Sequence, residues 1–147
     1  RPTTTATVAS CSTCCAPCSA EAPPDMSTAT PAGWPDRLPP PEAEEFPAAA
    51  VAWLLDNAPP EFRSHSVFRR RPVALARVVA HYTEGALGAS REAYSGVRRE
   101  LGEWLDPTGV TEVLTALEHE GVRLARVTRE VALVEEALKG RRWVPRL

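Results

Sequence analysis

Small and apolar residues recur at intervals of three and four along two long stretches of the chain. The first run consists of Val73, Ala76, Ala80, Thr83, Leu87, Ser90, Tyr94, Val97, Leu101 and Trp104, and the second of Val110, Leu114, Leu117, Gly121, Leu124, Thr128, Val131, Glu135 and Leu138. This spacing places each run on one face of a helix. The pattern predicts two long helices, over residues 72–105 and 110–139, that pack as an antiparallel hairpin.

The ends of these helices are marked by residues that favour helix boundaries. Pro72 suits the first turn of a helix, and residues 106–109, with the sequence Asp-Pro-Thr-Gly, are typical of a turn. Gly140 is expected to take the left-handed conformation that ends the second long helix. We therefore expect the connection between the helices to be short and well defined.

A shorter helix is expected upstream of the hairpin, over residues 42–57. Three glutamates, Glu42, Glu44 and Glu45, would lie in its first turn, where the helix dipole favours negative charge. Pro59 and Pro60 end this helix, and a short helical piece is expected over residues 61–70. The predicted fold is therefore all-α, a long antiparallel hairpin with a shorter N-terminal helix packed on it.

Residues 1–41 are expected to be a disordered leader, and residues 42–147 the helical domain. Five prolines between residues 31 and 41 prevent a helix there, although Trp34 and Leu38 are apolar enough to hold this segment against the helices. The formal net charge of −2 disfavours a polyanion binder as a whole. No stretch approaches the ~20 apolar residues of a transmembrane helix, so we expect a cytoplasmic protein.

All four cysteines, Cys11, Cys14, Cys15 and Cys18, lie in the leader and form the pattern C-x-x-C-C-x-x-C. Structural zinc sites usually separate two C-x-x-C pairs by a loop, whereas these pairs abut, so we do not expect a metal there. The segment is too polar for a secretory signal. Met26, the only methionine, is a possible true start, which would leave residues 1–25 without a selected structure.

Residues with catalytic chemistry do not form a known pattern. His65, His81 and His119 show none of the spacings that place two metal ligands on one helical face, so no metal and no cofactor are expected. An enzyme would require Arg77, His81, Tyr82 and Glu84 to converge in one cleft. We expect a protein that is not an enzyme.

Three consecutive arginines precede Pro72, at the start of the first long helix. Clustered cations are unfavourable at a helix N-terminus unless an anion neutralises them. We favour neutralisation by glutamates within the protein or a second subunit; Glu42, Glu44, Glu45 and Glu61 are available. The alternative is an external phosphate or acidic partner, whose candidate binding residues are Arg63, Arg69, Arg70, Arg71, Arg77 and His81.

The first long helix is rich in alanine and glycine, which suits close approach of more than one neighbouring helix. A second copy of the chain is the expected neighbour, with Tyr94, Leu101, Trp104 and Leu114 at the turn end of the hairpin as its contact. The alternative is a monomer with a partly bare hairpin. On the second long helix, alternating glutamates and arginines predict a solvated, ion-paired face, with Glu135 in the packing seam as the exception.

The phrases AVAWLLDNAPPEFRSHSVFRRRPVALARVVAHY, RRELGEWL and ALKGRRWVPRL resemble small, uncharacterised helical proteins of actinobacteria, over residues 34–147. The resemblance implies no activity, cofactor or catalytic residue. The function expected from the sequence is a non-enzymatic helical scaffold or protein-interaction module, which self-associates or binds a partner helix. The alternative is an accessory protein that binds nucleic acid or a phosphate ligand through Arg69, Arg70 and Arg71.

Overall fold

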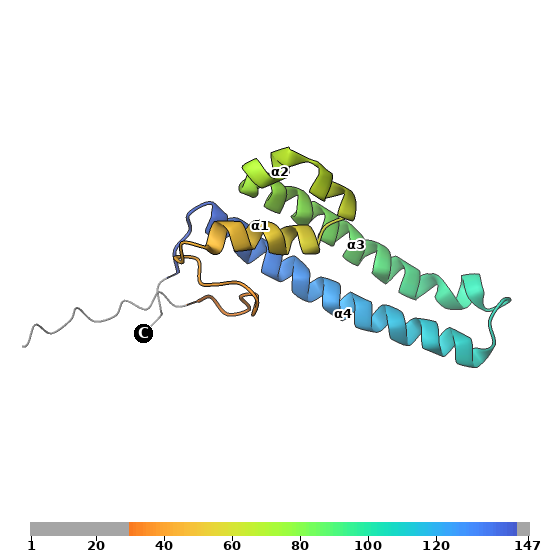
Figure 1. Ribbon diagram of the computed structural model, residues 1–147. Helices are drawn as coiled ribbons and strands as arrows, with labels where there is room; N and C mark the ends of the chain where they lie inside the picture. The colour runs from red at the N-terminus through yellow and green to blue at the C-terminus, as the bar shows by residue number, and fades with distance from the viewer. Residues whose placement is uncertain (1–29, 144–147) are drawn as a thin grey trace, which may run out of the picture.

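The protein folds as a helical hairpin with smaller helices packed near one end. The computed structural model describes residues 30–143, so the expectations for the four cysteines and Met26 lie outside the described residues. The elements are α1 (Phe46–Asp56), the 3-10 helix η1 (Pro60–Ser64), α2 (Ser66–Arg70), α3 (Pro72–Leu101) and α4 (Pro107–Leu138). Figure 1 shows α3 and α4 side by side and antiparallel. The predicted all-α hairpin fold is confirmed.

The hydrophobic core lies where α1 crosses the hairpin, in the half that is farther from the α3–α4 turn (Figure 1). Its fully buried side chains come from three helices and include Leu54, Leu75, Val79, Val131 and Val134. Burying one such side chain contributes about 1.5–3 kcal/mol. The core therefore fixes α1 on the hairpin, while the rest of the hairpin consists of α3 and α4 alone.

The predicted seam of α4 is confirmed along its whole length, because all nine of its positions are buried or half-buried. The seam of α3 is buried at Ala76, Ala80, Thr83, Ser90 and Val97. The same run also contains Val73, Tyr94 and Trp104, which are exposed. The hairpin packing thus follows the heptad pattern but does not cover every position of it.

Helix α1 begins at Phe46, so the expected start at residue 42 is wrong. Pro47 explains the difference, because a helix starting at residue 42 would need an N–H group at position 47 to bond the carbonyl of Ala43. Residues 40–46 instead form turns, in which Ala43 N donates to Pro40 O and Phe46 N to Ala43 O, both at 3.0 Å. The three glutamates therefore precede the helix, and its first turn contains no acidic residue.

The helical piece expected over residues 61–70 is divided in two by His65. The backbone of His65 is extended, with φ of −91° and ψ of 102°, between η1 and α2. Phe62 and Phe68 meet across this bend with ring centroids 5.0 Å apart. The bend turns α2 back beside the start of α3.

Helix α3 ends at Leu101 rather than at residue 105. The chain leaves the helix at Gly102, where an added Cβ atom would lie 2.5 Å from the carbonyl oxygen of Arg98, so a side chain there would force the backbone to shift. Trp104 N and Leu105 N both donate to Leu101 O, which closes the turn.

Helix α4 begins at Pro107, three residues earlier than expected. Asp106 is its N-cap, and the Asp106 carboxylate accepts a hydrogen bond from Gly109 N at 2.9 Å. Pro107 occupies a first-turn position where its missing N–H is not needed. The sequence Asp-Pro-Thr-Gly is thus the start of a helix rather than a turn.

The segment before α1 packs on the core, as expected for Trp34 and Leu38. Leu38 is buried, and the Trp34 indole N–H donates to the carbonyls of Leu38 and Pro39 at 3.3 and 3.2 Å. The Trp34 ring lies 5.5 Å from that of Phe46 and 6.1 Å from that of Trp143. The packed part of the chain therefore includes residues 34–41, ahead of the expected domain boundary.

Candidate functional site

The start of α3 lies beside an open groove of about 620 Å³, which we call the basic groove. It is lined by residues from α2, α3 and the C-terminal end of α4: Arg70, Arg71, Pro72, Val73, Ala74, Arg77, Glu135 and Lys139. Its floor is largely apolar, and four of its eight lining residues are cations. The groove contains three of the predicted binding residues, Arg70, Arg71 and Arg77.

Among the described residues, Glu135 is the only carboxylate that lines the basic groove, and it is 5% exposed. Its Oε1 atom lies 2.9 Å from Nη2 of Arg77 and 2.7 Å from Nζ of Lys139. These are ion pairs by distance, although Oε1 accepts no hydrogen bond of good angular geometry. Glu135 is therefore buried in the seam, as the sequence indicated, and holds two cations at the edge of the groove.

Lys139 and Glu136 extend this charge cluster. Lys139 Nζ also lies 3.2 Å from Glu136 Oε1, and contacts with Glu135 and then Glu136 raise the pKa of Lys139. Hydrogen bonds from Lys139, and then from Arg141, lower the pKa of Glu136. Both groups therefore stay ionised over a wider pH range than the free side chains.

The first turn of α3 adjoins the basic groove and contains backbone N–H groups that have no helical acceptor. Arg71 is the N-cap of α3, and no side chain caps this end of the helix. Pro72 has no N–H, and Leu75 N donates to Arg71 O, which leaves the amides of Val73 and Ala74 without a helical acceptor. The helix dipole adds partial positive charge at the same place.

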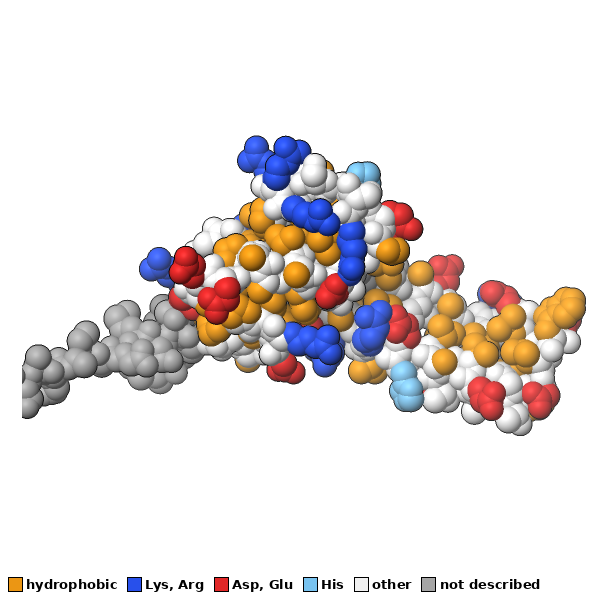
Figure 2. All heavy atoms as spheres, in the orientation of Figure 1, with side chains coloured by type: hydrophobic (Ala, Val, Ile, Leu, Met, Phe, Trp, Pro, Cys, Tyr) orange, Lys and Arg blue, Asp and Glu red, His pale blue; other side chains and the backbone are white. Residues whose placement is uncertain are grey.

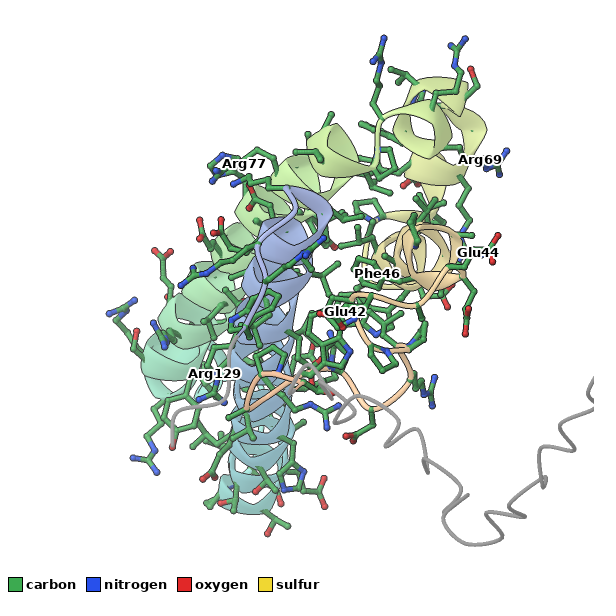
Figure 3. The ribbon with its side chains drawn as sticks, turned by 90° about the vertical axis from the view of Figure 1, so that its left-hand side faces the viewer. Glu42, Glu44, Phe46, Arg69, Arg77 and Arg129 are labelled. Atoms are coloured by element: carbon green, nitrogen blue, oxygen red, sulfur yellow. The ribbon has the colours of Figure 1, made fainter. Side chains whose placement is uncertain are left out.

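The six predicted binding residues do not form one site. Arg63 lies outside the basic groove and binds Asp56 Oδ1 at 2.5 Å, and His81 Nδ1 lies 3.7 Å from Glu84 Oε2 on an exposed part of α3. Figure 3 shows Arg69 and Arg77 on opposite sides of the molecule. Of the six predicted residues, Arg70, Arg71 and Arg77 line the basic groove, and the other three do not.

The neutralisation expected for Arg69, Arg70 and Arg71 is not found among residues 30–143, and its source in a second subunit stays a prediction, whereas Arg63 and Arg77 beside this triplet each pair with a carboxylate. Asp56 and Glu135 supply the carboxylates. Within residues 30–143, no carboxylate lies within 4 Å of Arg69, Arg70 or Arg71. Figure 2 shows several Lys and Arg side chains over α2.

Sequence reasoning missed Lys139 and Asp56. The i, i+4 spacing of Glu135 and Lys139 could have indicated the contact of Lys139, since such pairs share a helical face. Asp56 and Arg63 are joined across two bends, so helical periodicity contained no signal for their contact.

The solvated face predicted for α4 is confirmed. Arg123 donates two hydrogen bonds to Glu120, at 2.8 and 2.6 Å, and this contact lowers the pKa of Glu120. Arg126 pairs with Glu130 at 3.5 Å. Two larger grooves beside α4, of about 690 and 790 Å³, share Asp36, Arg126 and Glu130 in their linings. Each of these two linings contains three acidic and three basic residues, whereas the basic groove has four cations and one carboxylate.

The residues considered for an enzyme do not share one cleft. Arg77 faces Glu135 in the basic groove, whereas His81 and Glu84 pair with each other on the exposed surface. Across residues 30–143, no group of three or more His, Cys, Asp or Glu side chains is arranged to hold a metal ion. These two observations give no arrangement of side chains that indicates a particular catalytic reaction.

A second surface of interest is the end of the hairpin near the α3–α4 turn, residues 82–124, which we call the free end. Five of the eight exposed large hydrophobic side chains of the described residues lie there: Tyr82, Tyr94, Trp104, Leu105 and Val122. Trp104 is the most exposed, at 81%. Figure 2 shows hydrophobic side chains gathered over this end of the hairpin.

The free end also contains two small hollows that adjoin at Arg98. One, of about 370 Å³, is lined by residues that include Leu105 and Val110, and the other, of about 200 Å³, by Tyr94, Ser95, Arg98 and Leu114. Apolar side chains and an exposed arginine therefore form one continuous surface beside the turn.

Comparison with known proteins gives no relative, because no family model, no curated protein and no solved structure matches this sequence. The resemblance to small helical proteins of actinobacteria therefore stays a prediction. None of the described helices has the length and apolar character needed to cross a membrane.

Proposed function

We propose that this protein is a non-enzymatic helical interaction module that self-associates through its free end. The observation that carries the proposal is the exposure of Trp104 and Tyr94, at 81% and 46%, on a part of the hairpin that no third helix of residues 30–143 covers. Large exposed apolar surfaces on helical proteins are typical of interaction sites. Aromatic side chains are also the residues that most often dominate binding energy.

Helix α1 provides a reference for how this hairpin buries its surface. It packs against both α3 and α4 and completes the core in one half of the hairpin. The free end continues the same pair of helices without such a cover. Two hairpins placed free end to free end would supply four helices, which is a common and stable way to bury apolar helix faces.

The charges of the free end favour a second copy as the partner. Arg98 is exposed, lines both hollows and has no carboxylate within 4 Å among the described residues. Glu103 and Glu112 flank the turn and make no ion pair with a described residue. In a two-fold dimer every contact between the two patches occurs twice, once from each copy, so Arg98 of one copy can face a glutamate of the other.

Size-exclusion chromatography with light scattering of the full chain tests this proposal. We expect a dimer that Trp104→Ala and Tyr94→Ala weaken, each by about tenfold, because both remove aromatic contact area. Val67→Ala is the matched control, since Val67 is 48% exposed on α2, away from the free end. A dimer that responds equally to all three variants, or a wild-type monomer at every concentration, would contradict the proposal.

A further inference from the structure

We propose that the basic groove binds the phosphate group of a small phosphorylated ligand. Two observations support this site. The side chains of Arg70 and Arg71 lie beside the uncapped first turn of α3, and Glu135 holds Arg77 and Lys139 at the same groove. This site is separate from the free end and does not depend on self-association.

The cations of the groove come from three helices, which packing brings together. Arg70 belongs to α2, Arg71 is the N-cap of α3, Arg77 lies in the second turn of α3, and Lys139 follows α4. The buried carboxylate of Glu135 neutralises about one of these four charges and fixes the positions of Arg77 and Lys139. Arg70 and Arg71 are exposed, and Arg70 has only a 3.3 Å hydrogen bond to Ser66 Oγ. An excess of positive charge therefore remains at this helix end.

Three features of the groove suit a phosphate oxygen in particular. Val73 and Ala74 line the groove, and their backbone amides donate to no acceptor among the described residues. Arginine binds phosphate through two parallel N–H groups. The dipole of a 30-residue helix favours an anion at the same end. Arginines beside a helix N-terminus are unfavourable unless an anion neutralises them. No described carboxylate neutralises Arg70 or Arg71, and a bound anion would do so.

A small ligand fits better than a nucleic acid. The groove volume of about 620 Å³ is within the range of small-molecule sites. Arg69 lies on the opposite side of the molecule from Arg77, so the arginines do not follow one track along which a phosphate backbone could run (Figure 3). The lining also contains no aromatic side chain on which a base could stack.

The test is a titration of the isotopically labelled full chain with inorganic phosphate, followed by two-dimensional amide NMR at constant ionic strength. We expect saturable shifts of the Val73 and Ala74 amides. The double variant Arg70→Ala and Arg71→Ala should raise the dissociation constant by about tenfold or more. Arg69→Ala is the matched control and should change it by less than about twofold, because this neighbouring arginine lies outside the groove.

Three results would overturn the proposal. The first is equal weakening by Arg69→Ala and by the double variant, and the second is the same amide shifts with chloride alone. The third is that a single-stranded oligonucleotide binds more tightly than phosphate and that Arg69, Arg70 and Arg71 contribute equally to this binding. This result would indicate a surface that binds polyanions. Thermal melting of each variant shows whether the fold is retained. If the double variant does not fold, Arg71→Lys tests the site instead, because lysine keeps the charge but loses the paired N–H donors.

Discussion

The carboxylate of Glu135 lies 2.9 Å from the guanidinium of Arg77, across the seam between α4 and α3. The two ends of this contact have different surroundings, because the Glu135 side chain is almost fully buried and that of Arg77 is more than half exposed. The contact ties the last turns of α4 to the first turns of α3. It also places a charge where the heptad pattern would normally place an apolar residue.

Removing both cationic partners of Glu135 should destabilise the protein. The double variant Arg77→Ala and Lys139→Ala leaves a buried carboxylate without an ion pair, which we expect to lower the free energy of unfolding by roughly 1–3 kcal/mol. Glu135→Leu should be neutral or stabilising, since it replaces a buried charge by an apolar side chain in the seam. Urea denaturation measures the stability of both variants. If Glu135→Leu were less stable than the double variant, the ion pairs would not be what compensates the buried carboxylate.

Acid should destabilise the protein partly through Glu120 and Glu136. Their pKa values are lowered from 4.5 in the folded protein, by hydrogen bonds from Arg123 and from Lys139 respectively. The unfolded chain then binds more protons near and below pH 4.5, so these contributions are present above this range and are lost as the pH falls through the folded values. Urea denaturation between pH 7 and 3 measures this loss. The double variant Glu120→Gln and Glu136→Gln should show a shallower loss of stability, and an unchanged slope would contradict the assignment.

Gly140 should be intolerant of a side chain. Its φ is +86°, and it closes α4 with Gly140 N donating to Ala137 O at 2.8 Å and Arg141 N to Glu136 O at 3.0 Å. Gly140→Ala is therefore expected to cost about 1 kcal/mol or more. Gly88 provides the contrast, because it lies within α3 with no atom within 4 Å of an added Cβ, so Gly88→Ala should stabilise by up to about 1 kcal/mol. Thermal unfolding of the two variants should shift in opposite directions.

Asp106 should contribute to stability as the N-cap of α4. Asp106→Ala removes the acceptor for Gly109 N and should cost about 1 kcal/mol, whereas Asp106→Asn keeps an acceptor and should cost much less. Chemical denaturation distinguishes the two variants. Equal losses for alanine and asparagine would mean that the cap bond is not the source of the effect.

The hairpin could be predicted from the sequence because helical periodicity is a local property of the chain. The seam of α4, the buried Glu135 and the left-handed Gly140 all follow from spacing and residue type. The predicted starts of α1 and α4 were less accurate, since the structure places them at Phe46 and Pro107. Pro47 and the N-cap residue Asp106 in the sequence already indicated these positions.

The basic groove could be predicted only in part. The sequence indicates the arginine cluster, but which arginines share a surface depends on how α2 bends back at His65 and on where α4 ends. The contact between Asp56 and Arg63, and the separation of Arg69 from Arg77, are results of tertiary packing that periodicity does not describe.

Sedimentation equilibrium of the full chain over a range of concentrations, up to about 200 μM, tests the central claim of self-association most directly. If the free end is the contact between two copies, the weight-average mass should rise with concentration from 15.9 kDa towards twice that value, and Trp104→Ala should displace the rise to higher concentration. A mass that stays at 15.9 kDa over the whole range would contradict the account.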